Sequence, residues 1–275
     1  MKIKIIIFII SFIIFIAGYR EYNLLFNSKD KITFLNVGQG DSILITSKRG
    51  HRIIVDCGPD SKIIDQLESK LGFWARRIDM VIITHGDKDH YGGCRDVIEK
   101  YKVGKVMING AFDSKNQDYK SLLEFIQKQE IQILPSIQDT FITLGDSIEL
   151  HLLNPQYNLW EKDIRDDNPE SIVMLLKSAK NSILLTGDAD ESTEAKILSQ
   201  YSQLDVDILK AGHHGSKTST SDKLLDAITP QQVIISAGSN NSYNHPHPDI
   251  INKIKKRNIR IQEVKNYMTG IDILL

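Results

Sequence analysis

Four potential metal ligands lie within six residues of the chain, in the segment His85-Gly86-Asp87-Lys88-Asp89-His90. They follow an apolar stretch, 80–84, which predicts a buried strand that ends just before them. Two imidazoles and two carboxylates held this closely would repel one another or stay partly protonated, whereas a divalent cation neutralises them. A polar loop after a strand is the plain alternative. The cluster therefore predicts a metal site.

Two further strand ends carry residues of the same kind. Thr186-Gly187-Asp188 places a carboxylate after an apolar run, and the apolar run that ends near position 211 leads into His213 and His214. A lone T-G-D is usually a turn, and adjacent histidines are more often surface or core residues than ligands. Taken with the first cluster, they indicate three strand ends that meet at one edge. Asp188 suits a carboxylate that bridges two metal ions about 3.5–4 Å apart. One histidine of the pair can complete the ligands and the other can orient or protonate substrate, and the sequence leaves open which.

The segments that must position these residues alternate between strand and helix patterns, with no repeat of fixed period. The expected strands are 31–37, 42–47, 52–56, 78–83, 105–108, 131–134, 147–153, 171–177, 182–186, 205–210, 232–236, 259–264 and 271–274. The expected helices are 92–101, 118–129, 191–200, 221–227 and 248–257. Two mixed sheets faced by helices account for this order.

Composition limits the function classes. Hydrophobic residues make up 41% of the chain, which is ample for the core of one sizeable domain. The 34 basic and 35 acidic residues leave a net charge of −1, so an anionic substrate must be held locally. Cys57 and Cys94 are too few for a disulfide framework and form no C-x-x-C pair of a structural zinc. We expect small packing residues near the site, with one disulfide between them as the alternative.

The N-terminus differs from the rest of the chain. Lys2 and Lys4 precede fifteen uncharged, mostly apolar residues, 5–19. The run is shorter than the ~20 residues that span a bilayer comfortably, which is typical of a signal peptide or a short retained anchor. A buried core helix is the alternative. Positive charge before the run favours a folded domain outside the cytoplasm. We therefore expect a signal peptide or membrane anchor at 1–20, a linker at 21–30 and one domain at 31–275.

Taken together, the motifs resemble those of metallo-β-lactamase-fold hydrolases, and more closely the hydrolase domain of the ComEC family of DNA-uptake (competence) proteins. The resemblance covers nearly all of 32–273. Its segments are 34–42 (FLNVGQGDS), 55–58 (VDCG), 84–93 (THGDKDHYGG), 167–168 (DN) with Ser171, 185–188 (LTGD), 213–219 (HHGSKTS) and 244–248 (NHPHP). It implies an α/β fold, an αββα four-layer sandwich with one N-terminal apolar helix, in which 31–275 is the hydrolase domain and the metal site lies at one edge.

Three positions depart from the family pattern. The general fold has H-x-H-x-D-H, whereas this chain has Asp87 at the second ligand, as is usual in the ComEC-like branch. A carboxylate there hardens the site and favours manganese or magnesium beside zinc. No histidine stands where the broader fold supplies one before T-G-D; His151 lies within a strand, and the Asp167-Asn168 loop is the nearer substitute. The family's T-D-x-x-G turn is replaced by 266–270 (NYMTG), which puts its contact in doubt.

The site that the motifs predict holds two divalent metal ions, Zn²⁺ or Mn²⁺. The expected metal ligands are His85, Asp87, Asp89, His90, Asp188 and His213, and the expected catalytic residues are Asp89, His214 and Asp188. His85 and Asp87 hold one ion, Asp89 and His90 with a histidine of the pair hold the other, and Asp188 bridges them. A metal pair lowers the pKa of water from 15.7 toward ~7, which supplies hydroxide to attack phosphorus, while the cations absorb charge on the phosphoryl oxygens.

Residues around this edge are expected to select the substrate. Glycine-permitted turns can present N–H groups to an anion, and hydroxyl and lysine side chains can add to them; a plain hairpin turn and a helix N-cap are the alternatives. The expected substrate-binding residues are Gly40, Asp41, Asn168, Ser216, Lys217, Ser219 and His245. The basic stretch 253–260 is either a solvated helix face or a track for a nucleic-acid backbone, whose binding would weaken with salt. No aromatic stacking platform is evident near it.

We expect a secreted or membrane-anchored metal-dependent hydrolase and, from the resemblance, a nuclease that cleaves DNA phosphodiesters. The complete uptake proteins join this domain to a multi-helix membrane channel, which 275 residues with one apolar segment cannot build. A DNA-uptake channel would then be a separate partner. Two rival functions stay open: a hydrolase of the same fold that acts on a small phosphodiester, lactam or thioester, and a non-catalytic, metal-stabilised module that binds DNA or a partner.

Overall fold

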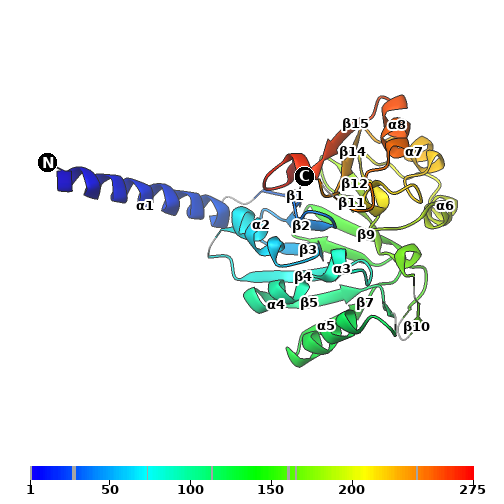
Figure 1. Cartoon of the computed structure of the whole chain (residues 1–275), viewed down its shortest axis with the longest axis horizontal. Helices are drawn as coiled ribbons and strands as arrows, with labels where there is room; N and C mark the ends of the chain where they lie inside the picture. Colours follow the sequence, from blue (N-terminus) through cyan, green and yellow to red (C-terminus); the bar gives the residue numbers. More distant parts are fainter. Residues whose placement is uncertain are drawn as a thin grey trace.

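The body of the protein is built from two seven-stranded sheets that face each other (Figure 1). The computed structural model describes residues 2–26, 29–72, 74–112, 114–159, 162–164, 166–239 and 241–275. Helices cover the outer face of each sheet, which gives four layers in the order α, β, β and α. The predicted αββα sandwich is therefore confirmed.

The first sheet combines antiparallel and parallel strands. Its order is β16 (Ile271–Leu274), β1 (Lys31–Phe34), β2 (Ser42–Thr46), β3 (Arg52–Cys57), β4 (Arg77–Ile83), β5 (Lys102–Ile108) and β7 (Gln132–Pro135). The outer helices are α2 (Lys62–Leu71), α4 (Cys94–Lys100) and α5 (Gln117–Lys128). From β3 to β7 neighbouring strands are parallel, and the helices supply the crossovers that parallel strands require.

The second sheet repeats this plan. Its order is β15 (Arg260–Glu263), β14 (Gln232–Ile235), β13 (Ile208–Lys210), β12 (Ser182–Leu185), β11 (Val173–Lys177), β9 (Ile148–Asn154) and β8 (Phe141–Leu144). Its outer helices are α6 (Glu191–Gln200), α7 (Asp222–Ile228) and α8 (Pro248–Lys256). Two short strands, β6 (Ala111–Phe112) and β10 (Lys162–Asp163), form a separate parallel pair.

Side-chain alternation along the strands explains the layers. In β2, Ile43 and Ile45 point into the core between the sheets, whereas Leu44 points into the core under the outer helices. Successive side chains of a strand face opposite sides, so a strand covered on both sides needs apolar residues at every position. The continuous apolar runs of this sequence therefore encode central strands of a sandwich.

The ligand-bearing loops lie where the two sheets meet at one edge. In the first sheet β4 is parallel to β5 and ends at Ile83; in the second sheet β12 and β13 are parallel to each other and end at Leu185 and Lys210. The loop after β4 continues into a short helix, α3 (Lys88–Tyr91). The carboxyl ends of parallel strands gather at one edge, so three distant parts of the sequence meet there.

The N-terminal helix differs from the expected leader and linker. The helix α1 (Lys2–Phe26) extends away from the sheets (Figure 1) and continues into the segment expected to be a linker, which has no proline or glycine to end it. The expected leader and residues 21–26 of the expected linker thus share one helix, while 27–28 lie outside the described residues. In the part of the chain that the structure describes, no helix combines the length and apolarity needed to cross a membrane.

Other differences are local. The helix α2 and the strand β8 were not expected, and β1 ends at Phe34 because the chain then turns through Gly38 and Gly40, both at positive φ. Cys57 and Cys94 form a disulfide that ties the end of β3 to the start of α4, with Cα atoms 5.1 Å apart. The disulfide alternative therefore holds, and both sulfurs lie in the core beside the ligand loop.

Candidate metal centre

Asp188 lies at the centre of four histidines. Its Oδ2 atom is 3.3 Å from Nε2 of His90, 3.4 Å from Nε2 of His214, 3.7 Å from Nε2 of His213 and 4.0 Å from Nε2 of His85. The backbone N–H of Asp188 donates to Oγ of Ser171 at 3.1 Å, which fixes the turn after β12. One carboxylate oxygen thus faces imidazoles from both sheets.

The loop after β4 is held by a buried carboxylate behind it. Asp56 accepts hydrogen bonds from the backbone and the hydroxyl of Thr84, both at 2.8 Å, and its Oδ2 lies 2.8 Å from Nδ1 of His90. The hydroxyl of Thr84 is also 3.0 Å from Nδ1 of His85. Both rings are anchored through Nδ1, so their Nε2 atoms are directed at Asp188. Asp56 lies in the motif 55–58 that carries the family resemblance, but no role in the site was predicted for it.

The second histidine pair sits on a sharp turn. His213 and His214 have φ values of 47° and 56°, in the left-handed region that non-glycine residues rarely adopt. Such strain persists where the surrounding structure over-determines the backbone, and it is common at functional sites. The turn sends the two rings apart: His214 is buried with Nδ1 2.8 Å from the carbonyl of Ser236, whereas His213 is partly exposed.

Lys210 is a buried cation behind the cluster. It forms an ion pair with Asp41, its ammonium donates to the carbonyl of Gly187 at 3.0 Å, and it lies 3.8 Å from Oδ1 of Asp188. Asp41 lies on the Nδ1 side of His214, with 3.6 Å between Oδ1 and Nδ1. A buried lysine needs such partners because an isolated buried charge is costly. Sequence reasoning missed Lys210, and its place at the end of an apolar strand was the available signal.

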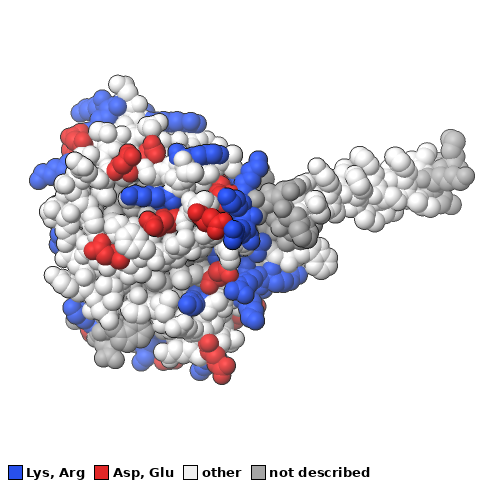
Figure 2. Space-filling view, turned by 180° about the vertical axis from the view of Figure 1, so that it is seen from behind, with Lys and Arg blue, Asp and Glu red and all other residues white. Residues whose placement is uncertain are grey.

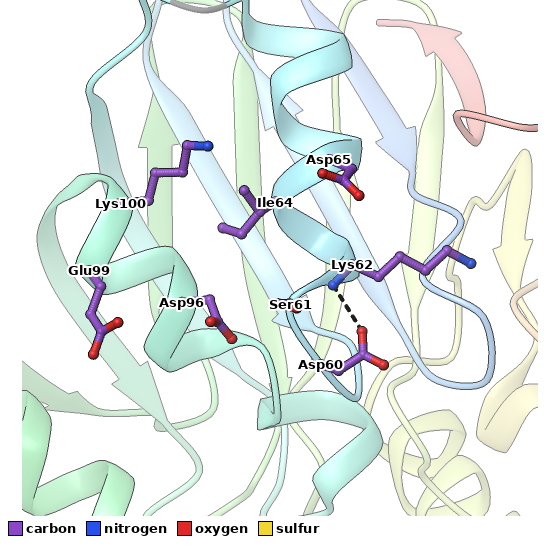
Figure 3. Close-up of a pocket in the computed structure, with 8 residues that line it drawn as sticks. All are labelled: Asp60, Ser61, Lys62, Ile64, Asp65, Asp96, Glu99 and Lys100. Atoms are coloured by element: carbon purple, nitrogen blue, oxygen red, sulfur yellow. Dashed lines mark hydrogen bonds between the residues drawn. The ribbon is translucent and has the colours of Figure 1, made fainter.

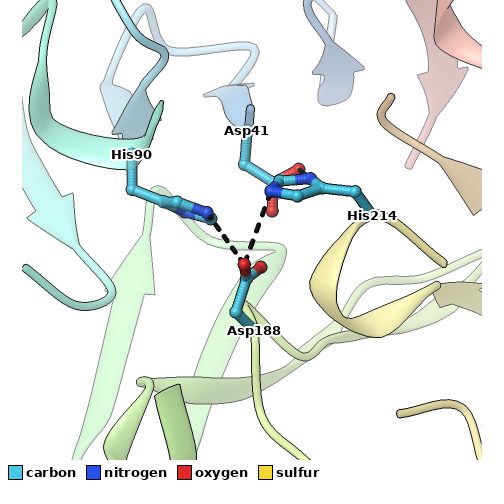
Figure 4. A group of neighbouring side chains, drawn as sticks. All are labelled: Asp41, His90, Asp188 and His214. Carbon is cyan, nitrogen blue, oxygen red and sulfur yellow. Dashed lines mark ion pairs between the residues drawn. The ribbon is translucent and has the colours of Figure 1, made fainter. Parts of the chain in front are cut away.

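The donor set fits a divalent metal. Asp41, His90, Asp188 and His214 are buried and each offers one ligand atom within 4.8 Å of the others (Figure 4). The Nε2 atoms of His85, His90 and His214 and Oδ1 of Asp188 are buried and have no hydrogen-bond partner. Unpartnered buried polar atoms are costly in native proteins and call for an explanation such as an ion. Imidazole and carboxylate are ligands of zinc, manganese and related cations.

Charges within the cluster shift the pKa values of its members. Burial acts against a charged His214, but Asp188 and Asp41 outweigh it and raise the pKa of His214 to about 9. Burial likewise opposes charging of His90, whose pKa Asp188 and Asp56 raise well above its ordinary value. The pKa of His213 is lowered, mainly by burial. Without metal, His90 and His214 therefore hold protons that a cation must displace.

Two acidic residues of the segment 85–90, Asp87 and Asp89, line a pocket beside the histidines. Asp87 Oδ2 lies 3.6 Å from Nε2 of His85, and Asp89 Oδ2 lies 3.2 Å from Nε2 of His214. A pocket of about 70 Å³ opens here, and its lining includes both aspartates, Asp188 and His213. The structure thus brings all predicted ligands together, and it places His214 rather than His213 in the compact buried group.

The expected anion-binding turn has a different role in the structure. Gly40 packs against the ligand loop so closely that a Cβ would lie 2.2 Å from the carbonyl oxygen of Asp89. The N–H of Asp41 donates to that same carbonyl at 3.2 Å, and the side chain of Asp41 is buried against Lys210. Gly40 and Asp41 therefore support the metal loop from behind, and their expected contact with substrate stays a prediction.

The expected hydroxyl and lysine cluster also faces elsewhere. Ser219 is buried and donates to the carbonyl of Gly212 at 2.7 Å, and the hydroxyl of Ser216 lies 3.1 Å from that of Thr218. Lys217 is exposed beside Asp249, 3.9 Å away. These serines stabilise the histidine turn, and substrate binding by this cluster stays a prediction.

Of the two remaining substrate-binding candidates, His245 lines the pocket and Asn168 lies in a turn beside the residue that holds the ligand loop. His245 lines the 70 Å³ pocket, and burial together with His213 and His214 lowers the pKa of His245 to about 4. Asn168 opens the turn η1 (Asn168–Glu170), and its Oδ1 is buried without a partner. Asp167 accepts the N–H of Gly86 at 2.7 Å and so holds the ligand loop.

His151 lies outside the site, in β9. Its Nε2 is 2.8 Å from Oδ1 of Asp139, and its ring stacks on Phe141 with 4.3 Å between centroids. It therefore offers no ligand to the cluster around Asp188.

Two of the five basic residues in the stretch 253–260 form ion pairs. Arg257 lies 2.8 Å from Asp222 and 2.7 Å from Asp226, and Lys253 lies 3.7 Å from Glu191. The face in Figure 2 likewise shows basic side chains interspersed with acidic ones. These pairs favour the solvated helix face over a continuous track for a nucleic-acid backbone.

A larger hollow of about 790 Å³ lies between α2 and α4, away from the histidines (Figure 3). Its lining contains four acidic residues and two lysines: Asp60, Asp65, Asp96, Glu99, Lys62 and Lys100. It contains no histidine and none of the predicted ligands. The metal centre is therefore the small polar pocket at the sheet edge and not the larger hollow.

The fold and site agree with the comparisons. Residues 35–239 match the Metallo-beta-lactamase superfamily. The chain is 28% identical to ComE operon protein 3 of Bacillus subtilis over 86% of this chain and 32% of that protein. It is 25% identical to competence protein ComA of Neisseria gonorrhoeae over 90% of this chain and 33% of that protein. Zn²⁺-bound PqqB from Methylobacterium extorquens shares the fold, with a TM-score of 0.56, 11% identity, and coverage of 89% of this chain and all of that one (100%).

The chain therefore belongs to the metallo-β-lactamase superfamily and is related to competence proteins, which confirms the resemblance. It spans about a third of the length of these curated relatives. The family, together with the buried group of His90, His214, Asp41 and Asp188, supports a hydrolase that uses divalent metal.

Proposed function

We propose that the chain is a phosphodiesterase that hydrolyses DNA with two divalent ions, Zn²⁺ or Mn²⁺. The observation that carries the proposal is the convergence of four Nε2 atoms on one oxygen of Asp188, all within 4.0 Å. His85 with Asp87 would hold one ion, His90 and His214 with Asp89 would hold the other, and Asp188 would serve both. Kinship with competence proteins supports DNA as the substrate.

The bound ions would supply Lewis acidity and an activated water molecule. Asp56 and Thr84 hold the rings of His90 and His85 in position for this task. Ser171 fixes the backbone of Asp188. His213 lies at the pocket mouth with a lowered pKa, so its ring is neutral and can accept a proton from a water molecule or the substrate. We therefore assign the ligand role to His214 and the substrate-facing role to His213, a choice that the sequence left open.

A metal-supplemented substrate panel tests the proposal. The purified full chain with Mn²⁺ or Zn²⁺ should cleave single- or double-stranded DNA, and Asp89→Ala should abolish cleavage. Asp96→Ala, the same substitution in the hollow between α2 and α4, is the matched control and should keep full activity. A rise in melting temperature with metal, without cleavage of any substrate, would instead favour a non-catalytic binding module.

One observation favours a second candidate function. The pocket beside Asp188 has a volume of only about 70 Å³, which suits a single phosphate-sized group. A small phosphodiester could therefore be the substrate, and a lactam or thioester could be attacked by the same centre. Turnover of a generic small phosphodiester or a chromogenic lactam, with DNA left intact, would support this candidate over the nuclease.

We also propose that the domain works outside the cytoplasm, secreted or held at the membrane by its N-terminal segment. The Cys57–Cys94 disulfide supports this location because disulfides persist in oxidising compartments. The lysines before the apolar helix also support this location, because positive charge favours the cytoplasmic side and leaves the domain that follows outside. In intact cells, a membrane-impermeant protease should degrade the domain after the outer barrier is opened; full protection would contradict the location. A separate DNA channel is the partner that this role would require.

A further inference from the structure

An exposed aromatic ring stands at the mouth of the metal pocket. Tyr243 is 65% exposed, yet it lines the same small pocket as Asp188 and His213. Its ring stacks on that of His245, with 5.8 Å between centroids and 25° between planes. His245 in turn lies 5.5 Å from His213, centroid to centroid. The aromatic surface therefore continues from the metal centre outward to solvent.

The loop that carries Tyr243 is fixed in place by its own side chains. The amide of Asn241 donates to the carbonyls of Gly238 at 2.9 Å and His245 at 2.6 Å, and its oxygen accepts the N–H of His245 at 2.9 Å. The N–H of His247 donates to the carbonyl of Gly215, beside the histidine turn, at 2.9 Å. These bonds restrain the backbone on both sides of Tyr243, so the loop loses less conformational entropy when Tyr243 binds a partner.

A donor without a partner lies beside this ring. Gln39 also lines the pocket, and its Oε1 accepts the N–H of Gly238 at 3.1 Å. Its Nε2 is buried and has no hydrogen-bond partner. The pocket thus offers an unused N–H donor and an exposed π-face next to a centre that suits a phosphate. A flat group with hydrogen-bond acceptors, attached to a phosphodiester, would satisfy both.

We propose that Tyr243, backed by His245, is a stacking platform for a nucleobase of an unpaired DNA strand whose phosphodiester lies at Asp188. The inference rests on the proposed function and names its substrate class, single-stranded DNA. In a duplex the bases are already stacked and paired, whereas an unpaired base can turn its face to a protein ring. Stacking of a base on an aromatic side chain is sequence-tolerant, so we expect little base preference.

The experiment separates the base from the phosphate. Cleavage of a fluorescein-labelled oligothymidylate by the full chain with Mn²⁺ is compared with cleavage of an oligomer of equal length in which every nucleotide is abasic. Wild type, Tyr243→Phe and Tyr243→Ala are measured beside Tyr157→Ala, whose ring is 69% exposed and lies outside the pocket. Binding of both oligomers is measured in EDTA by fluorescence anisotropy at one salt concentration.

Wild type should prefer the base-bearing strand by about 5- to 150-fold, the range expected for stacking one base. The preference should appear in KM and in binding, with kcat little changed. Tyr243→Ala should remove it, while Tyr243→Phe and Tyr157→Ala should keep it. The same variant should also lose any preference for single strands over duplex.

Equal preference in wild type and Tyr243→Ala would overturn the inference while leaving the nuclease intact. If wild type cleaves neither oligomer with any metal, the proposed function fails. The anisotropy measurement then still tests whether Tyr243 stacks on a base, because equal binding of the base-bearing strand to wild type and Tyr243→Ala contradicts stacking.

Discussion

Asp56 fixes the orientation of His90: its Oδ2 lies 2.8 Å from Nδ1 of the ring, opposite the Nε2 atom that faces Asp188. A carboxylate behind a ligating histidine sets the tautomer and raises the basicity of the ligand. Asp56 is itself fixed by two hydrogen bonds from Thr84 at the end of β4. The strand end, the carboxylate and the ligand therefore form one rigid unit.

Asp56→Asn should weaken metal binding by about 10- to 100-fold, because the amide no longer holds the ring as a carboxylate does. Titration calorimetry with Mn²⁺ or Zn²⁺ measures the loss. Asp139→Asn is the matched control, since Asp139 makes a comparable 2.8 Å contact with His151 far from the cluster. Unchanged affinity in Asp56→Asn would show that His90 does not depend on this contact.

Lys210→Met should destabilise the metal-free protein by about 3–5 kcal/mol, because it leaves Asp41 and Asp188 as buried charges without their cation. Urea unfolding in EDTA measures the difference. Lys31→Met, which breaks a part-exposed pair with Asp272, should cost only about 0–1 kcal/mol. Saturating divalent metal should restore more stability to Lys210→Met than to wild type; equal recovery would contradict a shared electrostatic centre.

The metal-free protein should lose stability as the pH rises from about 6.5 to 9. His214 has a folded pKa of about 9, above the unfolded value of ~6.5, so its contribution is complete below pH 6.5 and is lost as the pH passes through 9. We expect a change on the order of 2 kcal/mol, measured by urea unfolding in EDTA. His214→Gln should make the free energy of unfolding less dependent on pH. An unchanged pH dependence in this variant would mean that another group carries the raised pKa.

Removal of the Cys57–Cys94 disulfide should lower the free energy of unfolding by about 4 kcal/mol. The bond closes a sequence separation of 37 residues, and its loss frees that loop in the unfolded chain. Thermal unfolding of Cys57→Ala/Cys94→Ala measures the effect, and each single variant should match the double. A double variant as stable as wild type would mean that the crosslink adds no net stability.

The strands were predictable where the chain repeats apolar residues without a break. The runs at 78–83 and 182–186 predicted β4 and β12 to within a residue at each end, because strands buried on both faces require that pattern. The helix α2 was missed although Ile63, Leu67 and Leu71 recur at helical spacing on its buried face. The helical periodicity was present, but the turn residues at 58–60 directly before it favour a loop.

The candidate ligands were predictable because they are clustered in the chain, but their supports were not. Asp56 and Lys210 look like ordinary polar residues at strand ends. Lys210 meets Asp41 only because β13 and the turn before β2 belong to different sheets that converge at one edge. Tyr243 was likewise not singled out, and it gains meaning only from its place at the pocket mouth.

The apolar runs alone predicted two mixed sheets faced by helices, and the family resemblance added the αββα order of layers. The grouped imidazoles and carboxylates predicted the residue types of a metal centre. The tertiary structure decided which histidine points inward. His213 and His214 are neighbours in the chain, and only the left-handed turn, held against Ser236 and Asp41, sends one ring into the cluster and the other toward solvent. Such a choice depends on contacts between distant segments, which residue spacing does not encode.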